Sequence, residues 1–324
     1  MGDAFGWAFI GAGKLGATVA KTITASGRHK IVSVYVRNPE KRAAFAEKYG
    51  ALAAASAEEA ISADGVDGVY IVTPHTSHMD YAIKAIELGK PVLCEKPVTT
   101  DAAKARAIID LARERNVYFA EAMWTWFSPV ARKVKEWIDA GEYGEAVSLD
   151  MTYCMKSIGY APRVSDPMLA GGALLDVGIY PLTYAYRLFG KPASVTCKGV
   201  LKDGIDACEE IELSYPGGPT CSIRASIVDF RGLEKMRLVG TKGTTKLRFY
   251  HAAGSVKLKR KGAPTLKFKG QGGYLNEFDL AAGEIRAGLK ESALVPHRAT
   301  LDVMEIMDEC RAQMGLVYPF EKQS

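Results

Sequence analysis

The sequence predicts an α/β protein in which a doubly wound parallel sheet is followed by an α/β domain with a large, mostly antiparallel open sheet. Over roughly the first 120 residues, short apolar runs alternate with amphipathic helical segments, as in parallel strands joined by helices. After residue 193, strands of alternating polarity follow one another, separated by glycine and proline turns. We therefore expect two domains, over residues 1–122 and 123–324.

The composition is that of an ordinary globular protein. Of 324 residues, 48% are hydrophobic and 24% are charged, and the net charge is only +5. This mild charge does not indicate a nucleic-acid partner, and no apolar run is long enough to predict a membrane span. The six cysteines have neither C-x-x-C nor zinc spacing, and the N-terminus shows no targeting pattern. We expect a cytoplasmic location.

A glycine-rich stretch near the N-terminus carries the first functional signal. The apolar run Ala8–Ile10 leads into Gly11-Ala12-Gly13-Lys14-Leu15-Gly16, and a helical pattern follows. Strand, G-x-G-x-x-G and helix in this order are typical of a dinucleotide site. Gly11 allows the tight turn, Gly13 lets the pyrophosphate approach the backbone, and Gly16 lets the helix pack on the strand.

The end of the next strand indicates which dinucleotide binds. The strand 31–36 ends at Val36, about 20 residues after Gly16, where NAD sites place an acidic residue. Arginine suits a 2′-phosphate because its fork of donors matches that group. We expect NADP(H) to be bound by Arg37, Asn38, Lys41 and Arg42. In the alternative, these residues only decorate a solvated helix start.

A third strand, over 66–72, ends in Thr73-Pro74-His75, and a helix is predicted over 77–88. We expect Thr73, Pro74 and His78 to lie at the cofactor edge of the sheet. The spacing His75-x-x-His78 would suit a metal, but the surrounding sequence offers no cysteine or carboxylate partner. We expect no metal.

The stretch Cys94-Glu95-Lys96-Pro97 follows another apolar run. Charged groups at the end of a buried strand cost free energy unless something there uses them. Ligands of open α/β sheets sit at the carboxyl ends of the strands, so Glu95 and Lys96 are predicted to face the cofactor. The alternative is a surface ion pair before a turn.

The second half carries a matching motif, Gly171-Gly172-x-x-x-Asp176-x-Gly-x-Tyr180. Asp176 and Tyr180 are four residues apart, so a helix would place them on one face, opposite apolar residues. An acid and a phenol among apolar neighbours need partners, for which Lys96 is a candidate, and the three groups would form a proton relay. The alternative is a surface hydrogen-bonded pair. Further helices are predicted over 129–140, near 275–287 and over 297–314.

Together these motifs resemble the glucose–fructose oxidoreductase/inositol dehydrogenase (Gfo/Idh/MocA) family over nearly the whole chain. The stretch Glu121-Ala-Met-Trp124-Thr-Trp126-Phe127 is similar to the branch with dimeric dihydrodiol dehydrogenase and NADP-dependent D-xylose 1-dehydrogenase. The resemblance implies a Rossmann domain and a second domain with an open sheet, which forms dimers or tetramers. It also implies a cis Lys96-Pro97 bond.

The resemblance leads to a functional hypothesis: NADP(H)-dependent hydride transfer at a CH–OH group of a sugar or cyclic diol, or at a dicarbonyl in reverse. Lys96 would stabilise the reacting oxygen, Tyr180 would transfer the proton, and Asp176 would position Tyr180. The residues expected to bind substrate are Trp124, Trp126, Phe127, Tyr160 and Arg163. For the aromatic residues, packing between domains is the alternative, and for Arg163 it is plain exposure.

Two other functions remain open. A tightly held cofactor could oxidise and re-reduce a sugar, giving sugar–sugar exchange or glycoside cleavage. A non-catalytic nucleotide sensor is the third hypothesis, and loss of the lysine, the acid or the tyrosine would be its signature.

Overall fold

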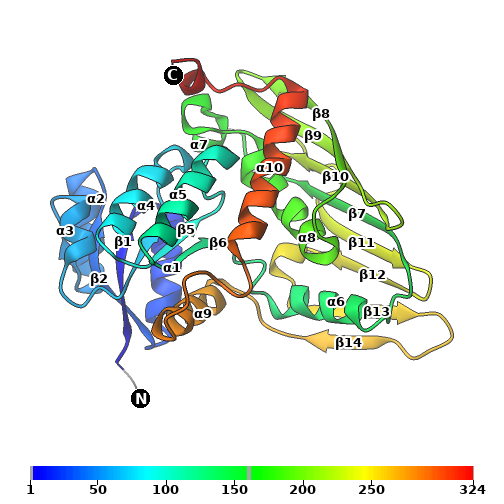
Figure 1. Cartoon of the computed structure of the whole chain (residues 1–324), viewed down its shortest axis with the longest axis horizontal. Coiled ribbons are helices and arrows are strands. Elements are labelled where there is room, and N and C mark those ends of the chain that lie inside the picture. Colours follow the sequence, from blue (N-terminus) through cyan, green and yellow to red (C-terminus); the bar gives the residue numbers. More distant parts are fainter. Residues whose placement is uncertain (1–2, 159–161, 324) are drawn as a thin grey trace. The chain divides into compact units, whose positions relative to one another are not determined.

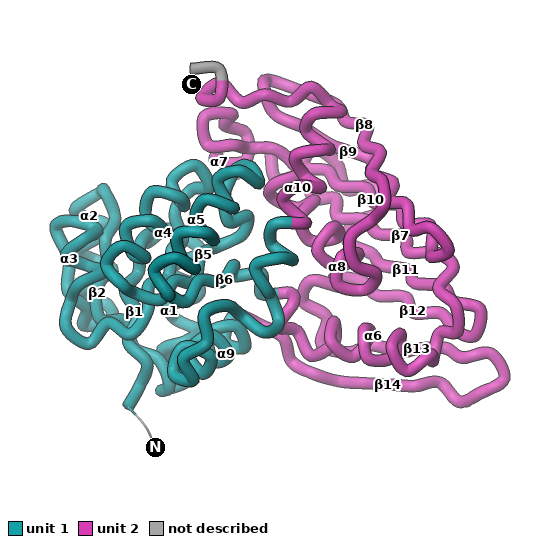
Figure 2. The backbone as a smooth tube through the Cα atoms, in the orientation of Figure 1, with its two compact units in different colours: residues 1–124, 274–301 teal, residues 125–273, 302–324 magenta. Residues whose placement is uncertain are grey.

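The computed structural model describes residues 3–158 and 162–323. It divides into two compact units, each built from two separate stretches of chain (Figure 2). Unit 1 comprises residues 1–124 and 274–301, and unit 2 comprises residues 125–273 and 302–324. The units therefore differ from the predicted continuous domains 1–122 and 123–324, because the segment 274–301 returns to the first unit.

Unit 1 is a doubly wound α/β unit (Figure 1). Among the described residues its sheet has six strands in the order β3-β2-β1-β4-β5-β6, all parallel. The strands are β1 (Phe5–Ile10), β2 (His29–Tyr35), β3 (Leu52–Ala53), β4 (Gly68–Ile71), β5 (Val92–Glu95) and β6 (Phe119–Ala122). The helices are α1 (Lys14–Thr24), α2 (Pro39–Tyr49), α3 (Ala57–Ser62), α4 (His78–Glu87) after the 3-10 turn η1 (His75–Ser77), α5 (Ala102–Glu114) and α9 (Tyr274–Arg286).

Helix α9 joins unit 1 because it completes the core of that unit. Phe278 is fully buried, and its ring centroid lies 4.9 Å from those of Trp7 on β1 and Tyr70 on β4. Strands β1, β4, β5 and β6 are buried at every position, as expected where helices cover both faces of a parallel sheet. The short elements β3 and α3 were not predicted from the sequence.

Unit 2 is built on a sheet of eight strands within the described residues, in the order β14-β13-β12-β11-β7-β10-β9-β8. Only β7 and β10 run parallel, so the predicted mostly antiparallel sheet is confirmed. The strands are β7 (Ala146–Cys154), β8 (Ser194–Lys202), β9 (Ile205–Ser214), β10 (Thr220–Ser226), β11 (Glu234–Gly240), β12 (Gly243–Arg248), β13 (Ser255–Arg260) and β14 (Leu266–Lys269).

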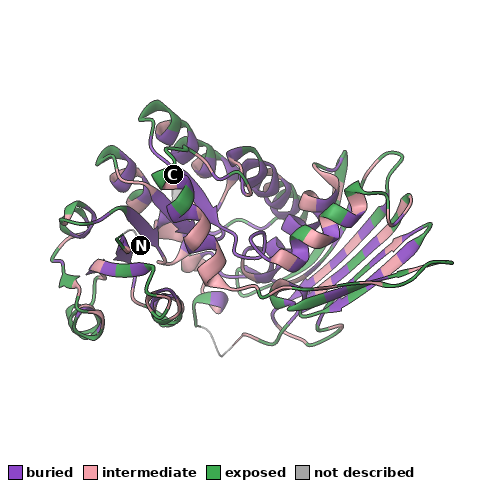
Figure 3. Cartoon of the chain, turned by 90° about the horizontal axis from the view of Figure 1, so that it is seen from below, coloured by how far each residue is buried: buried purple, intermediate pink, exposed green. Residues whose placement is uncertain are grey.

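Burial alternates along most of these strands, with buried positions facing the helices and exposed ones on the open face (Figure 3). Helix α6 packs on β13 and β14, and α8 packs on β7 and β10. The helical elements are α6 (Pro129–Asp139), α7 (Pro162–Ser165), η2 (Pro167–Leu169), a π-helical turn η3 (Leu174–Gly178), α8 (Ile179–Phe189), η4 (Tyr250–Ala252), α10 (His297–Met314) and η5 (Pro319–Gln323). The first residues of α10 belong to unit 1.

One segment of the described chain, Pro167–Phe189, is long and apolar enough to cross a membrane by length and composition. In the structure, 83% of its most apolar window is buried inside the protein. Burial of this kind is typical of a core helix.

Candidate active site

The glycine-rich turn between β1 and α1 has the shape that a dinucleotide pyrophosphate needs. Gly11 has φ +117°, and a Cβ there would lie 2.7 Å from the Val72 carbonyl oxygen. A Cβ on Gly13 would meet nothing within 4 Å, so this side of the turn is open. Gly13 caps α1 without a side-chain hydrogen bond, which leaves the amides of the first turn for an anion. The residues fit the cofactor.

The predicted 2′-phosphate residues surround the start of α2. The Asn38 side chain accepts a hydrogen bond from the Lys41 amide (2.8 Å) and so caps the helix. Arg37 and Lys41 are exposed, whereas Arg42 is half-buried and its Nη1 lies 3.4 Å from the Val36 carbonyl oxygen. Cationic side chains thus lie where β2 ends, at the position predicted for a 2′-phosphate. Asn38 caps α2 and so has a structural role.

His78 joins the two loops that follow β4 and β5. Its buried ring lies with Nε2 2.8 Å from the Thr73 carbonyl oxygen and Nδ1 3.0 Å from the Pro97 carbonyl oxygen. Thr73 and Pro74 are half-buried at the end of β4. No group of three or more potential metal ligands occurs among the described residues. His78 therefore acts as a brace between loops.

The end of β5 is buried together with its charges. Glu95 is 4% exposed and Lys96 is 9% exposed, which differs from the surface ion pair of the alternative interpretation. The Tyr70 hydroxyl donates to Glu95 Oε1 (2.6 Å), and the Lys96 amide donates to Oε2 (3.2 Å). The Lys96-Pro97 peptide is cis, as the resemblance implies.

Two further carboxyl groups lie in this part of unit 1. Glu121 on β6 accepts hydrogen bonds from the Val98 amide (3.2 Å) and the Thr300 hydroxyl (3.0 Å). Burial raises the pKa of Glu121 to about 7, although these hydrogen bonds and the nearby Lys96 ammonium oppose the shift. Glu277 on α9 is fully buried, and burial, with the charge of Glu95, raises its pKa well above the ordinary value. The lysine thus lies among acids.

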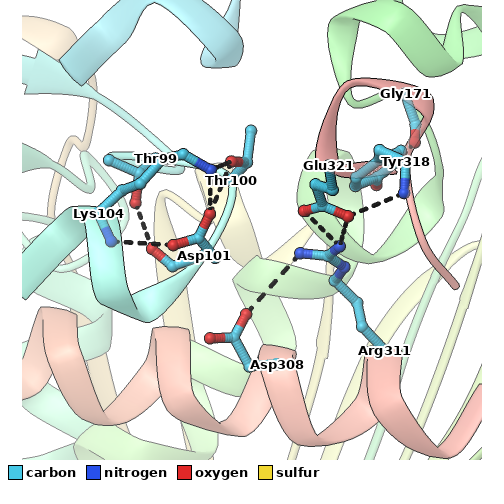
Figure 4. A network of polar contacts seen from close by, with 9 residues as sticks. All are labelled: Thr99, Thr100, Asp101, Lys104, Gly171, Asp308, Arg311, Tyr318 and Glu321. Atoms are coloured by element: carbon cyan, nitrogen blue, oxygen red, sulfur yellow. Dashed lines mark hydrogen bonds and ion pairs between the residues drawn. The ribbon is translucent and has the colours of Figure 1, made fainter. Parts of the chain in front are cut away.

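The chain after Pro97 is fixed by a small polar network (Figure 4). Asp101 caps α5 by accepting from the Lys104 amide (2.9 Å), and the Thr100 hydroxyl donates to the same carboxylate (3.1 Å). The Thr99 hydroxyl donates to the Asp101 carbonyl oxygen (2.7 Å). The turn that carries Lys96 is therefore preceded by the hydrogen-bonded Glu95 side chain and followed by the hydrogen-bonded segment 99–104.

In unit 2, the segment with Asp176 and Tyr180 is not the α-helix that the spacing predicted. Residues 174–178 form a π-helical turn, and the α-helix begins only at Ile179. The assumption of 3.6 residues per turn is therefore wrong across Asp176. Both side chains are nonetheless largely buried: Tyr180 is 8% exposed and the Asp176 side chain 12%. Such π-turns occur frequently at functional sites.

Arg163 is an ion-pair partner of Asp176. Its Nη2 lies 2.7 Å from Asp176 Oδ1, and 47% of the arginine side chain remains exposed. Unit 2 thus supplies Asp176 with a cation of its own. The predicted substrate residue Tyr160 lies outside the described residues.

The glycines of the motif allow the chain to approach two buried acids. A Cβ on Gly172, where φ is +130°, would lie 1.9 Å from Asp206 Oδ1, and one on Gly178 would lie 2.7 Å from Glu209 Oε1. Asp206 Oδ2 accepts from the Leu174 amide (2.5 Å) at the start of the π-turn. Burial raises the pKa of Asp206 to about 6 and that of Glu209 well above its ordinary value.

The C-terminal segment fixes the same loop from another direction (Figure 4). The Tyr318 hydroxyl donates to the Gly171 carbonyl oxygen (3.0 Å), and Glu321 accepts from the Tyr318 amide (2.8 Å). Arg311 on α10 pairs with Glu321 (2.6 Å), which holds this clamp together.

The predicted substrate aromatics have different environments. Trp124, 9% exposed, packs against Tyr274 in unit 1 with ring centroids 5.2 Å apart. Trp126 is 4% exposed and donates from Nε1 to the Thr183 carbonyl oxygen (3.1 Å) in unit 2. Phe127 is also buried. This favours the packing interpretation for Trp126, since its polar atom is already used.

Sequence reasoning missed the neighbours of Tyr180. Tyr153 stacks on Tyr180, and His251 lies beside both rings, held by Glu234. One sequence pattern indicates that Glu234 is buried: it lies two residues before the apolar Met236 on β11, so both side chains lie on the covered face of the strand. In the same way, Glu209 is in phase with Ile211 on β9. An acid on the covered face of a strand needs a partner.

The fold and the glycine turn define a dinucleotide-binding protein of the Rossmann class. Residues 5–122 match the oxidoreductase family with an NAD-binding Rossmann fold, and residues 131–246 match the GFO/IDH/MocA C-terminal domain. The chain belongs to this GFO/IDH/MocA family of oxidoreductases.

Two curated relatives match almost end to end. The chain is 29% identical to trans-1,2-dihydrobenzene-1,2-diol dehydrogenase of Mus musculus, over 98% of this chain and 99% of that protein. It is 30% identical to D-xylose 1-dehydrogenase (NADP(+)) of Hypocrea jecorina, over 97% and 93%. Aldose-aldose oxidoreductase of Caulobacter crescentus has the same fold, with a TM-score of 0.85 and 20% identity over 96% of this chain and 97% of that one.

Proposed function

We propose that the protein is an NADP(H)-dependent dehydrogenase or reductase that acts on a CH–OH group of a sugar or cyclic diol, or on the corresponding dicarbonyl. The observation that carries this proposal is the buried ammonium of Lys96 at the carboxyl end of β5. It lies in the same unit as the glycine-rich turn between β1 and α1. The names of the two full-length relatives support the substrate class.

The proposed chemistry uses one hydride and one proton. The glycine-rich turn between β1 and α1 would hold the dinucleotide, which would supply the hydride for reduction of a carbonyl and would take it up when the alcohol is oxidised. During reduction, Lys96 stabilises the negative charge that develops on the carbonyl oxygen, and the Tyr180 hydroxyl transfers its proton to that oxygen. Oxidation reverses both steps. Asp176, paired with Arg163, places a carboxylate near the start of α8 and positions Tyr180.

The preference for NADP(H) rests on the chain that follows β2. Val36 stands where NAD sites carry an acid, and Arg37, Lys41 and Arg42 provide cations. One relative carries NADP(+) in its name. A panel of aldoses, dihydrodiols and dicarbonyls, assayed with NADP(H) and with NAD(H), tests both parts of the proposal. Turnover of none of them, or turnover with NAD(H) alone, would contradict it.

We further propose a homodimer through the open face of the unit 2 sheet. The strand register aligns Glu210 on β9 with Lys235 on β11, and Glu212 with Arg237, all exposed on that face. A second copy turned by a two-fold axis could set acidic β9 against basic β11. Sedimentation should show that the parent protein is a dimer and that the double variant Lys235→Glu/Arg237→Glu dimerises more weakly. A monomeric parent protein would refute this.

We propose a cytoplasmic location.

A further inference from the structure

A histidine lies among the rings that surround Tyr180. In unit 2, the His251 ring centroid is 5.4 Å from that of Tyr153 and 6.0 Å from that of Tyr180, and the two tyrosine rings stack at 5.4 Å. The three side chains come from η4, β7 and α8. Two flat rings and an imidazole therefore converge at the residue to which the proton transfer is assigned.

Glu234 fixes the orientation of His251. Its Oε1 accepts from the His251 amide (2.6 Å), and its Oε2 contacts Nδ1 of the ring. The glutamate is 4% exposed, whereas 23% of the histidine side chain is exposed. A carboxylate at Nδ1 selects the tautomer with its proton on that nitrogen, so that Nε2 becomes a hydrogen-bond acceptor in the neutral ring.

The backbone on both sides of this pair is strained. Leu233, just before Glu234, has φ 51°, and Phe249, two residues before His251, has φ 49°. The two segments are joined by the hydrogen bond from the Phe249 amide to the Glu234 carbonyl oxygen (3.0 Å). A left-handed conformation costs free energy for large L-residues. Leu233 is 45% and Phe249 58% exposed, so burial of their side chains does not offset that cost.

Strain of this kind at two adjoining positions points to a function for the side chains it aims. The two aimed groups are Glu234 and the turn that holds His251. We propose that His251, oriented by Glu234, accepts a hydrogen bond from a hydroxyl of the substrate other than the one that reacts, and so selects polyhydroxylated substrates. This inference rests on the proposed function and names the recognition chemistry of that same site.

The chemistry of the cluster fits a sugar. Tyr153 is 9% exposed and supports the rings of Tyr180 and His251, whereas the His251 side chain is 23% exposed and carries an oriented imidazole nitrogen beside Tyr180. A site built to bind a hydroxyl discriminates against an analogue that lacks it, because the polar group of the protein is then left unpaired. His251 is therefore a specificity residue, distinct from the proton-transferring Tyr180.

The test pairs one enzyme change with one substrate change. The aldose that the panel identifies is compared with its 2-, 3- and 4-deoxy analogues in the parent enzyme and in His251→Phe, which keeps a flat ring against Tyr153. We expect the parent to turn over one deoxy analogue with a kcat/KM about 10- to 100-fold lower than the full aldose. For His251→Phe, kcat/KM for the full aldose should fall by the same factor relative to the parent. Its kcat/KM for that deoxy analogue should equal the value of the parent.

Three controls accompany the comparison. The melting temperature and the NADPH affinity of His251→Phe should match those of the parent, and Phe230→Ser, at an exposed neighbouring position, should keep the parent's selectivity. Glu234→Gln should reduce the discrimination as well, because the amide no longer enforces the Nδ1 tautomer.

Two results would overturn the inference. One is a parent that does not discriminate any deoxy analogue, and the other is a His251→Phe variant that loses or keeps activity equally on all substrates. Failure of the proposed function looks different: the parent would turn over no aldose, diol or dicarbonyl, and the role assigned to His251 would fall with it.

Discussion

The turn with Lys96 and the helix with Tyr180 are held in place in different ways. In unit 1, side chains hold the turn: Tyr70 bonds Glu95, and Thr300 and the Val98 amide bond Glu121. In unit 2, the backbone approaches two buried acids closely at Gly172 and Gly178, where there is no room for a Cβ. Isosteric changes should therefore be tolerated around Lys96, whereas one added methyl group should disrupt the segment before Tyr180.

The largest expected effect concerns the proton transfer itself. Tyr180→Phe removes the hydroxyl but keeps the ring that stacks on Tyr153. We expect kcat to fall by about 10²- to 10⁴-fold, with NADPH affinity unchanged. Steady-state kinetics and NADPH fluorescence titration measure the two quantities. A kcat within threefold of the parent would show that Tyr180 transfers no proton.

The second prediction breaks the backbone support in unit 2. Gly172→Ala places a methyl group against Asp206 at a positive φ, so we expect a loss of roughly 3 kcal/mol or more in the free energy of unfolding. Gly217→Ala is the matched control, because Gly217 also has a positive φ (70°) but a Cβ there meets nothing within 4 Å. Equal losses in the two variants, measured by denaturant unfolding, would refute the close approach to Asp206.

The third prediction tests the support around Lys96 through its pH dependence. The pKa of Glu121 is about 7 in the folded protein against an ordinary 4.5, so the folded state binds the proton more tightly. The corresponding stability is fully present below pH 4.5 and is lost as the pH rises through 7, by about 3 kcal/mol in all. In Glu121→Gln, the denaturant midpoint of unfolding should not fall over this pH range. In the control Glu87→Gln, which changes an exposed glutamate, the midpoint should fall as the pH rises, as it does in the parent.

The smallest expected effect lies outside both segments. Arg37→Ser should raise the KM for NADP by about 10-fold, or 1.4 kcal/mol, and leave the KM for NAD unchanged, because only NADP carries the 2′-phosphate. Parallel assays with the two cofactors give the ratio. A similar rise for both cofactors would place Arg37 elsewhere on the dinucleotide or in the fold.

The sequence predicted the parts of the site that are local in the chain. The glycine turn, the end of β5 and the helices α1, α4, α6, α9 and α10 follow from periodicity and from single motifs. The π-turn at Asp176 did not follow, because it depends on the Asp206 contact with the Leu174 amide, 32 residues apart. The cluster around Tyr180 also depends on distant segments: Glu234 on β11 is paired with Tyr153 on β7, and no local motif places His251 of η4 beside them.

The central claim is that Lys96 stabilises charge on the reacting oxygen, and Lys96→Met tests it most directly. The methionine keeps much of the buried volume and removes the ammonium. We expect kcat/KM for the substrate found in the panel to fall by about 10²- to 10³-fold while NADPH still binds and the fold is unchanged. Full NADP-linked turnover by Lys96→Met would contradict the account.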